Sequence, residues 1–367
     1  LSQNGLSALD VDATAGGTLV PVTPSTLTVT TGGDLQIFGL ARTADPGSEL
    51  HLTAAGQVFV DGLVQTDSLL AIQGGSDDSG AGILVMPLVL QTDGQGNLVD
   101  DQGRLIDDDG NLIDAAGQYV DADGNVLTVP PDAPVLGGNP VRLSGGELKT
   151  AAGGRITLDA TDGISLQGAV GGLSDAGGTL SADTVEITAA STAGAVTVTG
   201  RVDAADEINF TGAQVNVLAG GTVRVRAAGG DVRFRAGDTL FVQGASGGSS
   251  AALVQAPDLV HLLGEAVRVY GTVASTDGRV LLSAVDEVDV QGNVSAGTDV
   301  EVNAGVDADW TATQLESGTL VRGDLTGGSV EVSGAGALKA DGDVRVTAGQ
   351  DLTVASESVL QDGTKLR

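Results

Sequence analysis

Hydrophobic and polar residues alternate along most of the chain in bursts of about three to five residues. Clear examples are Val185-Glu-Ile187, Val223-Arg-Val225 and Val300-Glu-Val302. A period of two places successive side chains on opposite faces of a strand, so each burst predicts a half-buried β-strand. Pairs such as Gly-Gly, Ala-Gly and Asp-Gly separate the bursts and predict tight turns. Because helical periodicity is nearly absent, the pattern predicts an all-β protein.

The pattern apolar-x-apolar-x-Gly-x-Val-x-small recurs, in whole or in its first seven positions, at residues 58–66, 164–170, 196–204, 267–275 and 288–296. Pairs of bursts span about 20 residues, as from Val280 to Val300, and repeats of about 20–30 residues are typical of solenoids. We interpret the glycine as a corner between two faces, where small residues allow successive coils to approach at about 4.8 Å. The sequence therefore predicts a parallel β-helix with an aliphatic core, of about 13–15 coils.

One segment departs from this pattern. Residues 93–127 contain five heptads of the form Asp-x-x-Gly-x-apolar-apolar. A seven-residue period cannot stack in register with coils of twenty residues, so we predict very short strands joined by glycine turns, in a meander or hairpin array that projects from the rod. The predicted organisation is N-terminal coils over residues 1–76, a non-solenoid β insert around 77–140, and the main coil stack over 141–367.

Composition supports an aliphatic core and limits the partners. Apolar residues make up 41% of the 367 residues and aromatic residues only 2%, and the 57 glycines follow no collagen-like period. The formal charge of −31 repels phosphate backbones and anionic bilayers, so we expect no nucleic acid as partner. We also expect no membrane insertion, because no apolar run approaches the roughly 18–20 residues of a membrane helix. The start at Leu1-Ser-Gln-Asn leads us to expect a piece of a longer or processed protein.

Two stretches resemble a known family. They are Gly278–Gly305, GRVLLSAVDEVDVQGNVSAGTDVEVNAG, and Gly229–Gly244, GGDVRFRAGDTLFVQG. Both resemble the central repeats of the filamentous haemagglutinin family, the long secreted exoproteins and adhesins of Gram-negative bacteria. The resemblance covers residues 150–305 and 328–360, and residues 18–75 more loosely. It implies a right-handed β-helix, secretion, and a role in adhesion or surface structure.

Four arginines form the main candidate ligand site. Arg224, Arg226, Arg233 and Arg235 alternate with predicted inward residues and supply four of the 17 basic residues of a strongly acidic chain. A local basic patch of this kind would bind a sulfated or acidic glycan, or an acidic stretch of another copy. The alternative, which we favour, is an outward ladder of ion pairs with neighbouring Asp and Glu, each pair contributing little to stability.

Carboxylates of the heptad segment form a candidate calcium site. Asp107, Asp109, Asp121 and Asp123 lie two residues apart in pairs beside glycine turns, and calcium prefers several oxygen ligands in such a loop. Neither the EF-hand pattern nor the repeated calcium-binding nonapeptide is present. Asp-x-Asp-Gly is also favourable turn chemistry, so we favour solvated turns and expect no other cofactor. The two histidines, His51 and His261, are expected to be structural.

The sequence therefore predicts a structural rod segment of a secreted or cell-surface bacterial protein of the adhesin type, which presents inserts or ends for adhesion to a host or bacterial surface glycan or protein. One alternative is a self-assembling extracellular filament subunit, with end-to-end contacts between copies. A second is a polysaccharide-acting enzyme, since parallel β-helices also host such enzymes. We do not expect an enzyme, because only three lysines and few aromatic residues are present.

Overall fold

The computed structural model describes residues 26–43, 46–75, 82–87, 89–93, 98–99, 102–106, 112–121, 124–127, 142–171, 184–307, 316, 325–355 and 359–361. Its named elements are β-strands, and nearly all of them pair in parallel. The chain winds through three faces in turn, so that each strand pairs with the strand one circuit later. We call one circuit a coil. The prediction of an all-β, parallel, solenoid-like fold is confirmed.

Two faces of the stack belong to one 20-stranded sheet. The first face comprises β1 (Thr26–Thr31), β4 (Glu49–Ala54), β7 (Leu69–Gly74), β14 (Gly154–Ala160), β17 (Thr184–Ser191), β20 (Glu207–Gly212), β23 (Asp231–Ala236), the first parts of β26 (Leu259–Val269) and β28 (Arg279–Val290), β30 (Val300–Ala304) and β33 (Val344–Ala348). The second face comprises β2 (Leu35–Ile37), β5 (Val58–Val60), β8 (Ile83–Val85), β15 (Ile164–Leu166), β18 (Ala195–Val198), β21 (Gln214–Val217), β24 (Thr239–Val242), the last parts of β26 and β28, β31 (Ser329–Val332) and β34 (Leu352–Val354). Because β26 and β28 continue around the corner, they join the two faces into one sheet.

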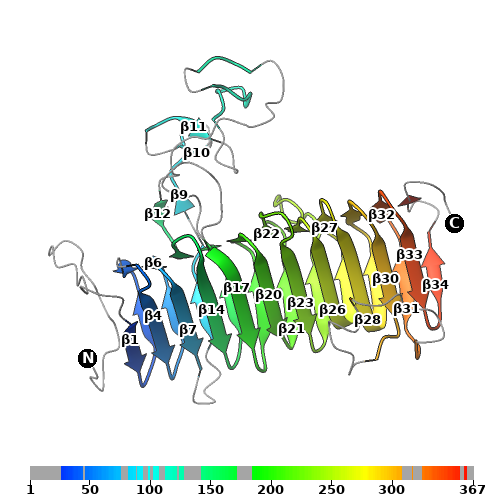
Figure 1. Cartoon of the computed structure of the whole chain (residues 1–367), viewed down its shortest axis with the longest axis horizontal. Helices are drawn as coiled ribbons and strands as arrows, with labels where there is room; N and C mark the ends of the chain where they lie inside the picture. The colour runs from blue at the N-terminus through cyan, green and yellow to red at the C-terminus, as the bar shows by residue number, and fades with distance from the viewer. Residues whose placement is uncertain are drawn as a thin grey trace.

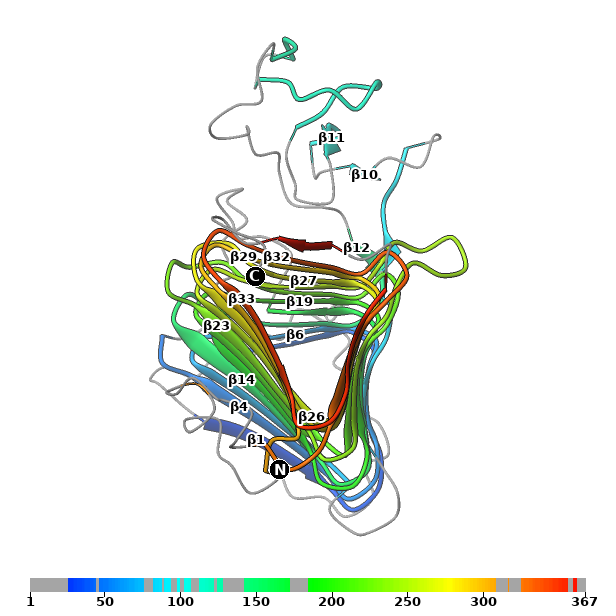
Figure 2. The ribbon, with the colours of Figure 1, turned by 90° about the vertical axis from the view of Figure 1, so that its right-hand side faces the viewer.

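The third face is a separate 11-stranded parallel sheet. It comprises β3 (Leu40–Arg42), β6 (Leu63–Thr66), β13 (Glu147–Thr150), β16 (Ala169–Val170), β19 (Arg201–Ala204), β22 (Thr222–Val225), β25 (Leu253–Ala256), β27 (Thr272–Ser275), β29 (Asn293–Ala296), β32 (Ala337–Ala340) and β35 (Val359–Gln361). Seen along the stack, the three faces form a triangular outline, with this sheet as one side (Figure 2). Along its length the stack is a row of parallel strands (Figure 1).

An aliphatic column fills the interior because the alternation stays in register from coil to coil. On the third face, one inward position of each strand from β6 to β32 is at most 1% exposed. These positions are Val64, Leu148, Val170, Val202, Val223, Val254, Val273, Val294 and Leu338. Two phenylalanines of the first face continue this pattern, since the rings of Phe210 and Phe234 stack in the interior with centroids 4.8 Å apart. Burial of such side chains is the main stabilising contribution to the stack.

The described part of the stack has fewer coils than the sequence predicts for the whole chain. The 11 strands of the third face mark eleven coils in the described part of the chain, which at about 4.8 Å each extend over roughly 50 Å. The expected 13–15 coils assumed one coil about every 20 residues. Three long connections use chain without adding a coil: those between β8 and β13, between β16 and β17, and between β30 and β31.

Glycines of the recurring pattern form one corner of the stack. Gly62, Gly168, Gly200, Gly271 and Gly292 all lie between the second and third faces. A Cβ atom on Gly292 would lie 2.0 Å from the carbonyl oxygen of Gly271 in the preceding coil. That same oxygen accepts a hydrogen bond from the Asn293 N–H at 2.9 Å. Glycine is therefore required at this corner by the close approach of successive coils, as the sequence predicts.

The heptad segment forms a β-meander. β10 (Leu98–Val99) pairs antiparallel with β11 (Leu105–Ile106), and single antiparallel bridges join Ile106 to Leu112, Ile113 to Tyr119 and Val120 to Val126. Gly103, Gly117 and Gly124 have φ values of 78°, 75° and 84°, the left-handed turn conformation that the heptads predict. Leu98, Ile106, Leu112 and Val120 pack into a small separate core. In Figure 1, β10 and β11 lie away from the stack.

The connection to this meander differs in one detail from the predicted insert of residues 77–140. β8 lies within that range, yet it pairs in parallel with β5 and β15 as part of the second face. The chain leaves the stack only after β8, through β9 (Val89–Leu90), which pairs antiparallel with β12 (Arg142–Ser144). Among the described residues, no helix is long and apolar enough to cross a membrane.

Candidate functional site

The four candidate arginines lie on two different faces. Arg224 is on β22 of the third face and Arg226 follows directly, whereas Arg233 and Arg235 are on β23 of the first face. Arg235 is exposed, and Arg233 is half-buried. Residues 227–230 form a turn at a corner of the stack. Inward and outward residues therefore alternate in both β22 and β23, but the two strands lie on different faces. Two separate groups therefore replace the single patch that the sequence suggests.

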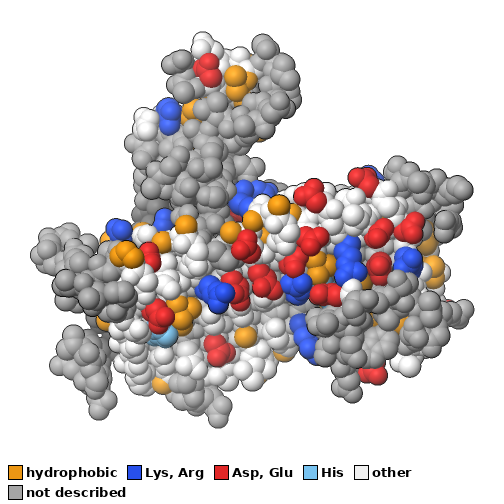
Figure 3. All heavy atoms as spheres, in the orientation of Figure 1, with side chains coloured by type: hydrophobic (Ala, Val, Ile, Leu, Met, Phe, Trp, Pro, Cys, Tyr) orange, Lys and Arg blue, Asp and Glu red, His pale blue; other side chains and the backbone are white. Residues whose placement is uncertain are grey.

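Arg233 belongs to an ion-pair network, as the favoured alternative predicts. Its Nη2 donates to Asp231 Oδ2 at 2.8 Å, its Nη1 to Glu207 Oε1 at 3.0 Å and its Nε to Glu316 Oε1 at 2.9 Å. Burial acts to lower the pKa of Arg233, but Glu316 and Asp231 outweigh it and raise this pKa. Acidic and basic side chains alternate in a band along the first face (Figure 3). The guanidinium of Arg233 is thus occupied by the protein's own carboxylates.

Glu316 lies in the connection between β30 and β31 and reaches three coils of the first face. We call Glu316 with Arg233, His261 and Arg279 the Glu316 cluster. The Nδ1 atom of His261 lies 3.1 Å from Glu316 Oε1, and Arg279 donates to the Glu316 carbonyl oxygen. Burial acts to raise the pKa of Glu316, but hydrogen bonds from His261 and Arg233 lower it to about 2. These contacts hold Glu316 against the first face of the stack.

An apolar patch beside this cluster holds the two described ends of the connection against the stack. Leu259, Leu263 and Leu281 stand on the outer side of β26 and β28, and pack with Val306 and Leu325 from the two ends of the connection. His261 beside them is only 2% exposed, and its Nε2 atom is buried without a hydrogen-bond partner. The expectation that His261 is structural agrees with this burial, although its partner Glu316 was not foreseen.

The stability that Glu316 provides is expected to disappear in acid. Its folded pKa, about 2, lies below the ordinary value of 4.5, so the folded chain takes up this proton at lower pH than the unfolded chain does. The difference in thermal midpoint between wild type and Glu316→Gln should be largest above about pH 5 and nearly gone by about pH 2. Glu331→Gln, which removes an exposed carboxylate on β31, is the matched control. A difference that stays constant down to pH 2 would contradict this assignment.

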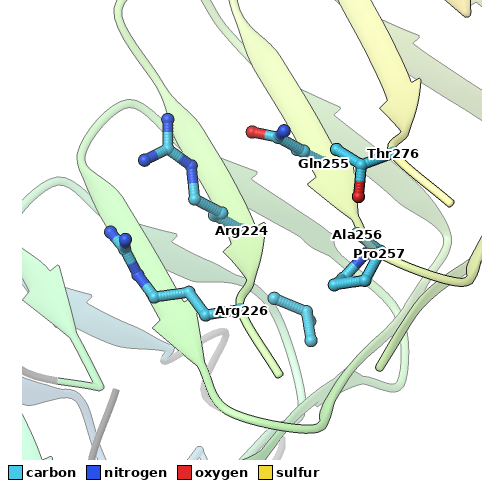
Figure 4. A pocket seen from close by; sticks show the side chains of 7 residues that line it. Arg224, Arg226, Gln255, Ala256, Pro257 and Thr276 are labelled. Atoms are coloured by element: carbon cyan, nitrogen blue, oxygen red, sulfur yellow. The ribbon is translucent and has the colours of Figure 1, made fainter. Parts of the chain in front are cut away.

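The second arginine pair lines a hollow on the third face. The hollow has a volume of about 340 Å³. Its lining consists of Arg224, Val225, Arg226, Gln255, Ala256, Pro257 and Thr276. We call it the Arg224–Arg226 hollow. Figure 4 shows both arginine side chains extending in the same direction from one strand, with Gln255 and Thr276 from the next two coils on the other side.

One buried carboxylate beside this hollow pairs with two guanidinium groups. Asp203 is 2% exposed, accepts a hydrogen bond from Arg201 Nε, and lies in register with Arg224. Arg226 Nε donates to Asp203 Oδ1 at 3.2 Å. Burial is the main cause that lowers the pKa of Arg226; Arg201 and Arg224 lower it further, while Asp203 opposes them. Asp203 thus positions the side chains of Arg201 and Arg226.

The candidate calcium ligands are only partly described. Asp107, Asp109 and Asp123 lie outside the described residues. Asp121 Oδ1 accepts the backbone N–H of Asn125 at 2.8 Å, and its Oδ2 accepts the Asn125 side-chain amide at 2.9 Å. Within the described ranges, no group of three or more His, Asp or Glu side chains is arranged to hold a metal ion. Asp121 therefore serves as a turn residue, and calcium binding stays a prediction.

Comparisons with known proteins return no relative of this chain. No family model matches it, and neither the curated proteins nor the solved structures contain a match. The resemblance to filamentous haemagglutinin repeats therefore stays a prediction from the sequence. The fold and the two charged groups on its surface are the basis for the functional argument.

Proposed function

We propose that the chain is a rod-like structural segment of a secreted or cell-surface bacterial protein of the adhesin type, wound as a right-handed parallel β-helix. The observation that carries this proposal is the unbroken register of the third face, in which 11 parallel strands follow one another. Right-handed winding is proposed because connections between parallel strands of one sheet are right-handed in nearly all cases. The resemblance to filamentous haemagglutinin repeats supports the same winding, the export and the adhesive role.

Such a role needs a stiff stack that holds another segment of the chain where a partner can bind it. Interior strands are hydrogen-bonded to both neighbouring coils, and one aliphatic core runs through the stack. Bending would open backbone hydrogen bonds on one face and separate packed valines inside. The heptad meander is carried on the side of this support, where a partner has access to it (Figure 1). A net charge of −31 keeps such particles apart in solution.

Electron microscopy and an adhesion assay test this proposal together. Negatively stained chain should appear as isolated short rods, and beads coated with it should attach to bacterial or host cells more than beads coated with the heat-denatured chain. Compact globules, or equal attachment by both bead types, would contradict the proposal. Release of oligosaccharides from an acidic polysaccharide would favour the enzyme alternative instead.

A filament subunit is the second candidate, because the outermost described coils expose apolar side chains. Leu352 and Val354 on β34 are 52% and 42% exposed, and Leu27 on β1 is 42% exposed. Unpaired strand edges beside apolar side chains recruit further strands. If copies join end to end, fibres should form at high protein concentration, and Leu352→Lys should leave isolated rods. Rods of one length at every concentration would exclude this candidate.

A further inference from the structure

We infer that ordered water molecules bind to three buried polar side chains on the outer side of the first face: His261, Ser283 and Asn303. This inference goes beyond the rod proposal, because it assigns a binding site and its ligand to one described wall of the stack. The three residues are 2%, 0% and 1% exposed. They lie on the neighbouring strands β26, β28 and β30. We call them the buried polar group.

The position of the buried polar group in the sheet is the first argument. Its three residues alternate with core residues along their strands, so their side chains point outward from the core. Ser283 pairs in register with Asn303, at the strand spacing of about 4.8 Å. His261 is two residues before Leu263, which pairs in register with Ser283. The three side chains are therefore neighbours on one wall of the stack.

The unpaired hydrogen-bonding atoms of the group are the second argument. Ser283 Oγ, Asn303 Oδ1 and Nδ2, and His261 Nε2 are buried and have no hydrogen-bond partner among the described residues. A buried polar atom that is left unpaired lowers stability. Buried water molecules in proteins bind where several otherwise unpaired polar atoms lie together. Four such atoms on three neighbouring strands thus indicate a shared ligand.

The hydrogen-bonding chemistry of these atoms limits what the ligand can be. Glu316 is ionised near neutral pH because its pKa is lowered to about 2, and an ionised carboxylate only accepts hydrogen bonds. His261 Nδ1, which lies 3.1 Å from Glu316 Oε1, therefore donates, and Nε2 of the neutral imidazole is an acceptor. The Ser283 hydroxyl and the Asn303 amide both donate and accept. The ligand must likewise donate and accept, as water does.

Burial of the group favours water over larger ligands and over a metal ion. Because the side chains are at most 2% exposed, a sugar or a peptide cannot reach them. The unpaired atoms include no carboxylate oxygen, which hard cations prefer. Within the described ranges, no group of three or more His, Asp or Glu side chains is arranged to hold a metal ion. Water fits both the size and the chemistry of the site.

A high-resolution crystal structure of the chain tests the inference directly. Electron density for a water oxygen should lie within hydrogen-bonding distance of Ser283 Oγ and of the Asn303 side-chain amide. Density for a protein group at these atoms, or for no partner at all, would overturn the inference.

Substitutions test the inference in solution through the sign of the change in stability. Ser283→Ala and Asn303→Leu replace the polar groups by apolar groups of similar size. If water binds there, each substitution should lower the folding equilibrium constant, measured by urea denaturation, by roughly fivefold or more. If the polar atoms are unpaired, the same substitutions should raise that constant, because they remove a buried group without a partner.

The same chemical changes at half-buried positions serve as matched controls. Ser295→Ala on β29 and Asn216→Leu on β21 alter outward side chains of the other two faces, and should change the folding constant little. An unchanged or higher folding constant in Ser283→Ala and Asn303→Leu would overturn the inference. Neither this result nor the crystal structure depends on the particle's shape in the microscope or on its adhesion, so the water site and the rod proposal can fail separately.

Discussion

Replacing Gly292 by alanine is expected to lower the free energy of unfolding of the stack by about 3 kcal/mol. The added Cβ would lie 2.0 Å from the carbonyl oxygen of Gly271, closer than atoms can approach. That oxygen is backbone and accepts the Asn293 N–H, so relief requires breaking or stretching a bond between coils. Equilibrium denaturation in urea measures the overall loss. Amide hydrogen exchange on β27, β29 and β32 should show where it arises.

Gly33→Ala is the control for this substitution. A Cβ on Gly33 would meet nothing within 4 Å, so the change there should cost little. The comparison separates crowding at the corner from the general effect of replacing glycine by alanine, which restricts the unfolded chain in both variants. If both variants lose the same stability, the close approach of coils is not the reason for glycine at this corner.

Phe210→Ala is expected to be the most destabilising single truncation in the core, at about 3–5 kcal/mol. Phe210 is 1% exposed and stacks on Phe234 of the next coil, with the ring planes 7° from parallel. Truncation would leave a cavity beside the Phe234 ring, which hydrogen-bonded strands at about 4.8 Å spacing cannot close by moving together. Urea denaturation of the purified variant measures the cost.

Phe241→Ala is the matched aromatic control for that truncation. Phe241 stands on the outer side of β24, half-buried, with its ring edge-on to Tyr270 at 5.3 Å. Its removal should cost clearly less than removal of Phe210, because solvent fills the space. Phe210→Leu should recover most of the loss, since it restores much of the volume. Equal costs at positions 210 and 241 would mean that the interior column contributes less than we argue.

Most of the stack could be predicted from the sequence because its construction is local. Inward and outward positions alternate within each strand, as in Val223-Arg-Val225, and the same alternation repeats one coil later in Val254-Gln-Ala256. The corner glycines could be predicted for the same reason: each occupies a fixed place between two bursts. The turn glycines of the heptad segment, such as Gly117 and Gly124, likewise follow from their own neighbours.

The number of coils, and the residue at which the chain leaves the stack for the meander, could not be predicted in this way. Long connections interrupt the period, and nothing in their composition shows where the chain rejoins the stack. Ile83-Leu-Val85 lies between a glycine-rich tract and the heptads, so its short alternation gave no reason to place it in the stack. Only its parallel pairing with β5 and β15 shows that it belongs there.

The sequence predicted the arginines of the candidate site but not their partners. The four arginines were visible, but alternation alone does not show that a corner separates Arg226 from Arg233. The partners that decide their roles are distant in the chain: Glu316 is 83 residues from Arg233, and Asp203 is 23 residues from Arg226. Whether an arginine is neutralised depends on which carboxylate the winding brings beside it.

Because the glycine corner recurs coil after coil, whole repeats of this chain are interchangeable in geometry. Excising residues 279–299 would remove one circuit and place β30 against β26, with a similar corner on both sides of the junction. Unequal recombination in the gene could thus shorten or lengthen the molecule in steps of one repeat without redesigning its interior. A protein of this construction can adjust its reach during evolution while the surface groups on the remaining circuits stay unchanged.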